Sequence, residues 1–516
     1  MDERQLKSLW TVTAPIRPFE SLAGDLSVDV VVVGAGIAGL TAALLLKRAG
    51  RRVAVVEMAR VATGQTGQTT AHLTELLDAG YKTLASDFGR HGAQLAAASQ
   101  RAAIEQVASL VEELGIRCGF TRVPGWVYTE REHDVPSLEQ ELEAARAAGL
   151  TASRAAAPPL PFSVKAAFRV EDQAQFHPRE YVRALAEAVH GDGCHVFERT
   201  RVTRVTDGRP CSVETEHGVL RAEAVLETTQ APLNRVVMHT KNFPYRTYAI
   251  AGRLSKPLEP GLYYDTDEPY HYTRTHTLED GTWAILGGED HKVGEVEDTE
   301  ACFRRLETWA RSRFPLESVA HRWSGQVWEP ADGLAYIGRN GLSRSIYVAT
   351  GFSGTGMTFG TLAAMILSDL VLGRPNPYAA LYDATRLKPA ASARDWVQEN
   401  AKVAYHFVAD RVRKAPAPPP EALAPGEGAV LDVGGEKVAV CRTDDGVLHA
   451  VSPVCTHLGC HVHWNRAERS WDCPCQGSRF GPDGQVWTGP AQQDLARKVL
   501  LADAPLGSGG EEPGKD

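Results

Sequence analysis

The chain has 516 residues, enough for about three domains of ordinary size. Hydrophobic residues make up 43% of the chain and charged residues 23%, values that are ordinary for a globular protein. The formal net charge of −9 is modest and the Lys and Arg residues are scattered, so nothing indicates a nucleic-acid partner.

The N-terminal segment argues against a targeting signal. It reads MDERQLKSLW, with two acidic residues and no apolar core, so it resembles neither a secretory signal nor a membrane anchor. The longest apolar runs, such as 30–33 and 42–46, are much too short to span a membrane. We therefore expect a soluble, cytoplasmic protein with no membrane span.

Residues 29–57 form a predicted βαβ unit that is typical of dinucleotide-binding proteins. The β-branched run 29–33 is followed by a glycine-rich turn, an Ala- and Leu-rich helix ending near Gly50, and a second strand that ends at Glu57. The turn carries the G-x-G-x-x-G pattern, with its glycines at Gly34, Gly36 and Gly39. They permit a tight turn, close approach to a pyrophosphate, and helix–strand packing, and Glu57 can accept hydrogen bonds from ribose hydroxyls.

The rest of the chain shows weaker patterns. Residues 59–170 look largely helical, with Ala-rich stretches at 94–114 and 137–148. Residues 176–206 predict a turn, a helix and a strand, and His177 is expected to cap the turn. Residues 243–290 predict strands, and residues 346–373 predict a strand, a glycine turn and a helix.

A proline-rich segment marks the clearest boundary in the chain. Five prolines lie between Pro416 and Pro425, and they favour extended structure over regular helix. We assign residues 411–427 to a linker and 428–505 to a small all-β domain with short strands and Gly- and Asp-rich turns. The tail, 506–516, is expected to be disordered.

Several segments resemble the D-amino-acid oxidase-like family of FAD-dependent oxidoreductases, which has the glutathione-reductase-type FAD fold. They read ATGQTGQTTAHLT (62–74), FHPREYV (176–182), WSGQVWEPADGLAYIG (323–338) and ATGFSGTGMTFG (349–360). The resemblance implies an α/β, Rossmann-like FAD-binding domain with an inserted mixed β-sheet substrate domain. Residues 1–410 would form this oxidoreductase, with the discontinuous FAD-binding part at about 25–80, 170–230 and 320–400.

The resemblance also implies which residues surround the cofactor. Thr66, Gly67, Thr69 and Thr70 would lie near the pyrophosphate and flavin, and residues 351–358 beside the isoalloxazine ring. The second glycine turn precedes a helix, whose N-terminus can stabilise negative charge on the reduced ring. Together with the first turn, the expected FAD-binding residues are Gly34, Gly36, Gly39, Glu57, Thr66, Gly67, Thr69, Thr70, Gly351, Gly354, Thr355, Gly356, Met357 and Thr358.

The nine cysteines fall into two groups. Five are isolated and are expected to be buried structural thiols: Cys118, Cys194, Cys211, Cys302 and Cys441. The other four lie within 21 residues, in CTHLGC (455–460) and CPCQGS (473–478), a density that indicates metal or redox chemistry.

These two loops resemble a Rieske [2Fe–2S] domain, in which two cysteines bind one iron and two histidines bind the other. The resemblance implies that Cys455, His457 and Cys473 are cluster ligands, and that Cys460 and Cys475 form a disulfide between the loops.

The fourth ligand position departs from the Rieske pattern, because Gln476 stands where the second histidine is expected. An amide oxygen is a poor ligand for iron beside thiolate and imidazole. Three interpretations remain open: a docking module without a cluster, a cluster with an unusual fourth ligand, or an engineered or aberrant substitution. His461 and His463 are close in sequence and could supply the fourth ligand. They follow Cys460 instead of preceding it, so we do not expect them to point at the cluster.

The resembled family predicts the reaction class. A carbon that bears an amine would give a hydride to flavin N5, and electrons would leave singly through the [2Fe–2S] cluster. Tyr270, Tyr272 and Arg274 are candidate substrate residues, since Arg could bind a carboxylate and the aromatic rings could shape a pocket. The alternative is an ordinary strand with alternating exposed side chains.

Three function classes stay open. The first is an FAD-dependent amine or amino-acid dehydrogenase that takes a small-molecule substrate and passes electrons to an acceptor protein or a quinone. The second is a redox partner or assembly subunit whose C-terminal module is a docking domain without an intact cluster. The third is a flavin-dependent tailoring enzyme of secondary metabolism.

Overall fold

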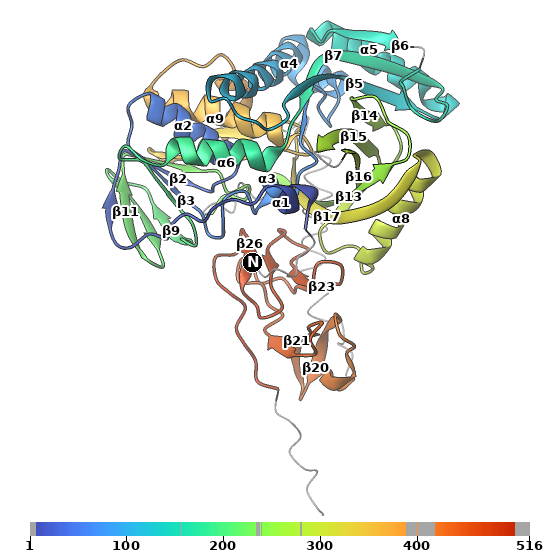
Figure 1. The fold of residues 1–516 in the computed structure, drawn as a ribbon. Helices are drawn as coiled ribbons and strands as arrows, with labels where there is room; N and C mark the ends of the chain where they lie inside the picture. Colours follow the sequence, from blue (N-terminus) through green and yellow to red (C-terminus); the bar gives the residue numbers. More distant parts are fainter. Residues whose placement is uncertain are drawn as a thin grey trace, which may run out of the picture.

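The chain folds into a large body that carries a smaller C-terminal module on one side (Figure 1). This computed structural model describes residues 7–155, 157–233, 238, 240–278, 281–388, 400 and 418–500. The first part of the predicted linker, 411–417, and the C-terminal tail lie outside the described residues.

A largely parallel sheet forms one half of the body, with the strand order β18-β19-β12-β2-β3-β8. Its strands are β2 (Val30–Val33), β3 (Val53–Val56), β8 (His195–Phe197), β12 (Ala224–Glu227), β18 (Tyr336–Arg339) and β19 (Ile346–Thr350). Only the β18–β19 pair among these is antiparallel. All residues of β2 and β3 are buried, which explains their β-branched sequences.

Three helices pack together beside this sheet (Figure 1). They are α2 (Ile37–Arg48), α6 (Pro178–Val189) and α9 (Gly356–Leu372), and α2 contacts both of the others. The predicted βαβ unit and the second strand–turn–helix are both confirmed. The side chain of His177 caps α6 by accepting the N–H of Glu180, as expected.

A mixed sheet forms the other half of the body, with the order β17-β13-β16-β15-β14-β5-β7-β4 and β6 paired to β7. Its strands are β4 (His72–Leu73), β5 (Thr121–Thr129), β6 (Ala152–Ala155), β7 (Ala166–Gln175), β13 (Asn242–Leu254), β14 (Leu262–Asp265), β15 (His271–Leu278), β16 (Gly281–Lys292) and β17 (Leu316–Pro330). The parallel β14–β5 pair joins segments distant in sequence. This sheet confirms the predicted substrate domain.

Helices border the mixed sheet and correct one expectation. They are α4 (Tyr81–Glu113), α5 (Val135–Ala148) and α8 (Thr299–Arg313). The prediction of a largely helical 59–170 holds for α4 and α5 but is wrong for β5 and β7. Those two strands pair with each other over most of their length, and such long-range pairing overrides the local Ala-rich composition.

Shorter elements complete the body. A small sheet has the order β1-β11-β10-β9 and consists of β1 (Leu26–Ser27), β9 (Val202–Thr206), β10 (Cys211–Thr215) and β11 (Gly218–Ala222). The short helices are α1 (Leu9–Thr13), α3 (Gln65–Gln68), α10 (Ala379–Tyr382) and the 3-10 turns η1 (Glu132–Asp134) and η2 (Pro420–Ala422).

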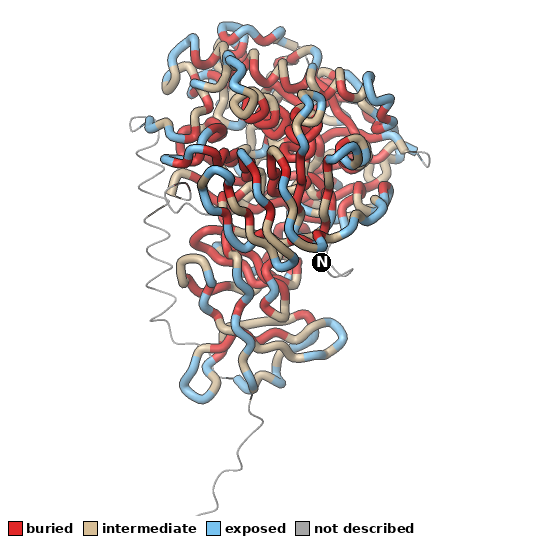
Figure 2. The backbone as a smooth tube through the Cα atoms, turned by 90° about the vertical axis from the view of Figure 1, so that its left-hand side faces the viewer, coloured by how far each residue is buried: buried red, intermediate tan, exposed pale blue. Residues whose placement is uncertain are grey.

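The C-terminal module is all β, as predicted, and contains two small sheets. One has β20 (Gly428–Val433), β21 (Glu436–Arg442) and β22 (Leu448–Val451); the other has β23 (His463–Asn465), β24 (Ser470–Asp472), β25 (Arg479–Phe480) and β26 (Val486–Thr488). Its core packs Trp471 and Phe480 against the four clustered cysteines. The half of the module that faces the body is the more buried one (Figure 2).

The isolated cysteines are all buried, which confirms their predicted place in the cores. No helix within the described part of the chain is long and apolar enough to cross a membrane.

Candidate functional site

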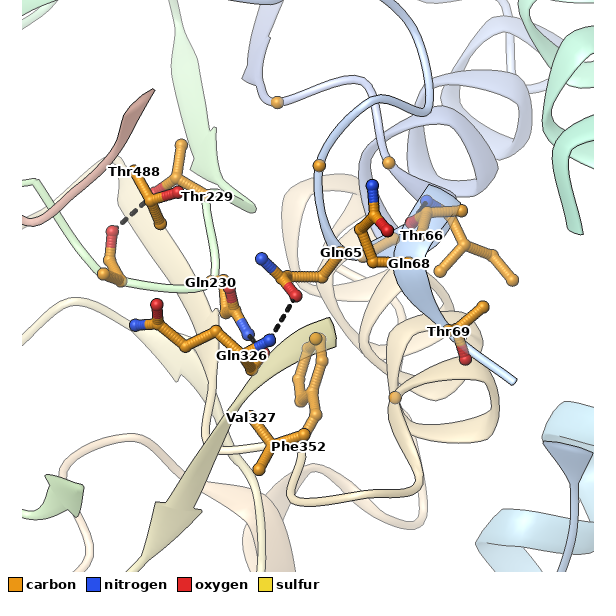
Figure 3. Close-up of a pocket in the computed structure, with 18 of the residues that line it drawn as sticks. Gln65, Thr66, Gln68, Thr69, Thr229, Gln230, Gln326, Val327, Phe352 and Thr488 are labelled. Atoms are coloured by element: carbon orange, nitrogen blue, oxygen red, sulfur yellow. Dashed lines mark hydrogen bonds between the residues drawn. The ribbon is translucent and has the colours of Figure 1, made fainter. Parts of the chain in front are cut away.

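A cavity of about 310 Å³ runs through the body between the parallel sheet and the mixed sheet. One end lies at Glu57 and Met58, where β3 ends, and its middle follows the first glycine turn and α3. The other end is lined by the turn before α9 and by tyrosines of the mixed sheet. Figure 3 shows polar side chains such as Gln65, Gln230 and Gln326 converging on this space.

The first glycine turn is shaped by close backbone contacts. Gly34 has a φ of 106°, and a Cβ there would lie 2.9 Å from the carbonyl oxygen of Thr228. A Cβ on Gly39 would overlap the carbonyl oxygen of Gly34. Gly36 lines the cavity and begins α2 without a side-chain cap, so the helix N-terminus can face an anionic group.

Glu57 supports the turn as well as lining the cavity. Its Oε2 accepts the N–H of Ala35 at 3.0 Å and its Oε1 accepts the N–H of Ala59 at 2.8 Å. Burial raises the pKa of Glu57, and the nearby Glu198 adds to the rise, although the backbone N–H groups act against it. The carboxyl group therefore stands at the cavity end where an acidic residue would meet a ribose.

The segment 62–74 closes the cavity beside the first turn. Thr66 accepts the N–H of Ile37 at 3.1 Å and lines the cavity together with Thr69 and Thr70. Helix α1 holds this segment from outside: Ser8 Oγ donates to Gly67 O at 2.6 Å and Trp10 Nε1 donates to Thr69 O at 2.6 Å.

The second glycine turn brings α9 to the other end. Gly351 has a φ of 74°, and a Cβ there would lie 2.5 Å from Asn242 Oδ1. The N–H of Gly354 donates to Asp78 Oδ2 at 2.6 Å. Gly354, Thr355, Gly356 and Met357 line the cavity, whereas Gly39, Gly67, Gly351 and Thr358 lie behind its wall.

Tyrosines and ionisable groups gather at this second end. Tyr270 and Tyr272 line the cavity with ring centroids 5.6 Å apart. The ring of His72 lies 5.6 Å from that of Tyr272, and its Nδ1 is 2.8 Å from the hydroxyl of Tyr264. Asp78 and Asp290 also line this end. Sequence patterns did not single out His72, Tyr264, Asp78 or Asp290.

Arg274, the third candidate from the sequence, does not line the cavity. Its Nη1 donates to the carbonyl oxygens of Ala71 at 2.5 Å and Phe176 at 3.2 Å. Its guanidinium also lies over the ring of Trp10. In the structure, Arg274 therefore holds together the backbone segments at Ala71 and Phe176, and a role in substrate binding stays a prediction.

The two cysteine loops lie together in the C-terminal module. Cys460 and Cys475 form a disulfide, which confirms their predicted pairing. The sulfurs of Cys455 and Cys473 are within hydrogen-bonding reach of each other, and backbone N–H groups of both loops point at them. Such N–H groups stabilise thiolates, so the pair fits the sulfur ligands of an iron site.

The histidine side of this iron site is incomplete. His457 is half-buried, and burial lowers its pKa to about 4, which keeps the imidazole in the neutral form that binds metals. Gln476 is 3% exposed, and no described group hydrogen-bonds to its Oε1. The residues fit three ligand positions of a Rieske cluster, with a buried amide at the fourth.

A buried charge network, defined here as Arg246, Glu468, Asp472 and Arg479, joins the module to the body. Glu468 bonds both Arg246 on β13 and Arg479 on β25, and Arg479 Nε lies 3.0 Å from Asp472. Burial alone would raise the pKa of Asp472, but Arg479 and Arg246 outweigh it and lower that pKa. Glu468 and Arg479 also line the cavity, so both parts of the chain build its wall.

Further contacts place the cysteine loop against the cavity wall. Gln326 Nε2 on β17 donates to Gly477 O at 3.0 Å, while the backbone N–H of Gln326 donates to Gln65 Oε1 at 2.6 Å. A Cβ on Gly477 would lie 2.5 Å from Pro244 of β13. Thr488 of β26 reaches the cavity beside Thr229 (Figure 3). The cysteine loop therefore lies in direct contact with β13 and β17 at Gly477.

The elongated cavity, its two glycine turns and Glu57 fit a flavin adenine dinucleotide, and the adjoining loops fit an iron–sulfur centre. Fold and site together define a flavin-dependent oxidoreductase with an iron–sulfur module. Comparison with known families agrees: the FAD dependent oxidoreductase family matches residues 29–370 and the Rieske [2Fe–2S] domain matches residues 414–499. The chain belongs to the FAD-dependent oxidoreductase family and carries a C-terminal Rieske [2Fe–2S] domain.

Individual relatives share this organisation in whole or in part. YhfW of Bacillus subtilis, named as a Rieske 2Fe-2S iron-sulfur protein, is 32% identical over 95% of this chain and 97% of its own length. Gamma-glutamylputrescine oxidoreductase of Escherichia coli is 24% identical over 69% of this chain and 86% of its own.

Solved structures share the fold of the body. Glycine oxidase from Geobacillus kaustophilus superposes with a TM-score of 0.61 at 21% identity, over 70% of this chain and 99% of that protein. L-proline dehydrogenase from P. horikoshii gives a TM-score of 0.55 at 18% identity, over 72% and 98%.

Proposed function

We propose that this protein dehydrogenates a small amine or amino-acid-like substrate and passes the electrons to its own Rieske centre. When bound, FAD supplies a hydride acceptor for the carbon that bears the nitrogen. The chain's residues bind the dinucleotide along the two glycine turns and the threonines of 62–74. The tyrosines at the other end shape a site for the substrate.

One contact carries the electron-transfer part of the proposal. Gln326 lines the cavity, and its side-chain amide hydrogen-bonds to Gly477, the residue after Gln476 in the cysteine loop. A hydrogen bond therefore connects the wall of the flavin cavity directly with the loop that holds Cys473. Because the buried charge network holds the module in this position, the electrons need no movement of the module.

The reaction class can be tested by mixing the purified holoprotein, without oxygen, with a panel of amines and amino acids. We expect at least one compound to bleach the flavin absorbance. The proposal fails if dithionite bleaches the flavin but no member of the panel does, while the protein is retained stably by a partner in pull-down.

A second candidate function follows from Gln476. If the amide cannot replace the histidine, the module is a docking domain and the flavin delivers electrons elsewhere. Iron quantification of the wild type and of Gln476→His separates the two candidates. Two irons per chain in both proteins, the number in a [2Fe–2S] cluster, support the first. Iron only in Gln476→His supports the second.

The cytoplasmic location and an external acceptor protein or quinone also belong to this proposal. The Rieske domain supports the acceptor, because a one-electron centre gives the electrons an exit from a two-electron flavin.

A further inference from the structure

Two carboxylates line the substrate end of the cavity, Asp78 exposed and Asp290 half-buried. Asp78 follows β4, and Asp290 lies on β16. The N–H of Gly354 fixes Asp78, and a Cβ on Gly354 would lie 3.2 Å from the hydroxyl of Tyr270. Tyr270 in turn hydrogen-bonds to Asp290. Both acids therefore lie near the turn that begins α9, where the family resemblance expects the flavin ring.

The walls around the two acids are aromatic, and two polar atoms in them lack hydrogen-bond partners. Tyr272 bonds Thr247 at 2.7 Å, and Tyr264 occupies Nδ1 of His72. His72 is 8% exposed and lines the cavity, yet its Nε2 is buried without a hydrogen-bond partner among the described residues. Oδ1 of Asp290 also has no hydrogen-bond partner among the described residues. Buried polar atoms normally have partners, so these atoms indicate a polar ligand.

Among the described residues that line the cavity, no Lys or Arg side chain is shown to pair with the two acids. The cationic residues among the described cavity lining are Arg201 and Arg479. Arg201 pairs with Glu216 and Asp494, and Arg479 belongs to the buried charge network. Arg274 is committed to backbone carbonyl oxygens.

The negative charge at this end of the cavity favours substrates that carry a positive charge. Burial raises the pKa of Asp78. Burial also raises the pKa of Asp290 to about 7, and the charge of Asp78 contributes to that rise. A bound ammonium group would offset both rises in pKa, whereas a bound carboxylate would add a third negative charge beside the two acids.

We propose that Asp78 and Asp290 recognise the substrate by a protonated amine, so that the substrate is an amine without a carboxylate on its reacting carbon. This inference rests on the proposed amine dehydrogenation and narrows its substrate class. Tyr270 and Tyr272 form the walls around the chain of that amine, and His72 offers it one further hydrogen bond.

Equilibrium binding to the FAD-loaded protein tests the inference without turnover. The probes are n-butylamine, butyrate and glycine, followed by the perturbation of the flavin absorbance spectrum. We expect n-butylamine to bind and the two carboxylates to bind at least tenfold more weakly. Binding of butyrate or glycine as tight as that of n-butylamine would overturn the inference.

Variants of the two aspartates test whether these residues bind the amine. Asp290→Asn and Asp78→Asn should each weaken n-butylamine binding at least tenfold, while Glu436→Gln, which removes one charge from the exposed surface of the module, should not. Unchanged binding in both aspartate variants overturns the assignment. If amines bind but do not bleach the flavin, the proposed dehydrogenation is refuted and this inference stands. If α-amino acids bleach the flavin and amines do not, the dehydrogenation stands and this inference is refuted.

Discussion

Gly39 shows how one missing side chain shapes the dinucleotide site. It lies behind the cavity wall, where a Cβ would overlap the carbonyl oxygen of Gly34 and lie 2.7 Å from Thr228 Oγ1. Its role is to let α2 approach β2 and β12 closely, so that the helix N-terminus can face the cofactor.

We therefore expect Gly39→Val to lose the flavin. The added side chain would push α2 away from the turn, and the purified protein should lack the yellow absorbance. Gly50→Ala is a matched control at the far end of α2: its φ of 80° makes it strained, but nothing lies within 4 Å of its Cβ. A Gly39→Val protein that keeps stoichiometric flavin would contradict this account of the turn.

Asp290 should make stability depend on pH. Its folded pKa of about 7 lies above the ordinary value of 3.8. Burial is the largest cause of the rise, and the charges of Asp78 and Glu289 add to it, while hydrogen bonds from Thr247 and Tyr270 act against it. A raised folded pKa gives stability that is complete below the unfolded pKa and is lost as pH rises through about 7.

Relative to wild type, Asp290→Asn should therefore become more stable by a few kcal/mol as pH rises from 5 to 8. Urea denaturation of both proteins at saturating FAD measures the difference. Parallel pH profiles for the two proteins would show that Asp290 is ionised throughout.

At the scale of elements, the two glycine turns were predictable and the tyrosine end was not. Strand, glycine turn and helix are local patterns, so the sequence predicts both helix N-termini of the site. The cluster of His72, Asp78, Tyr264 and Asp290 depends on β4, β14 and β16 meeting in one sheet, which no local pattern encodes.

Helix α1 is a further element that local patterns missed, because it has only five residues. Its Ser8 and Trp10 hold the carbonyl groups of Gly67 and Thr69, on the segment that closes the cavity. Ser8→Ala should cost about 1 kcal/mol of stability, because the carbonyl of Gly67 loses its buried donor.

The same Ser8→Ala variant should also release FAD faster than wild type. Flavin fluorescence after dilution measures the release. Val12→Ala, at an exposed position of the same helix, is the control. Equal release rates for Ser8→Ala and wild type would mean that α1 does not support the cofactor segment.

At the scale of the whole molecule, the buried charge network fixes the module against the cavity. The sequence indicated two domains and a linker, but it could not show that they meet, since Arg246 and Glu468 are more than two hundred residues apart. It also could not show that Gln326 reaches the cysteine loop. The domain boundaries themselves stay predictions.

Glu468→Gln should loosen this interface. Removing the carboxylate leaves Arg246 and Arg479 buried without it, which typically costs about 3–5 kcal/mol. Proteolysis within the linker and a lower unfolding midpoint should follow. Lys498→Ala, which breaks an ion pair between exposed parts of the module, is the control. Equal protease resistance of Glu468→Gln and wild type would contradict the fixed interface.

The most direct test of the central claim is the EPR spectrum of the protein after anaerobic addition of a substrate that bleaches the flavin, with no other reductant. We predict that the signal of the reduced iron–sulfur cluster appears, at a rate independent of protein concentration because the transfer is within one chain. A fully bleached flavin beside a cluster that stays oxidised would contradict the claim.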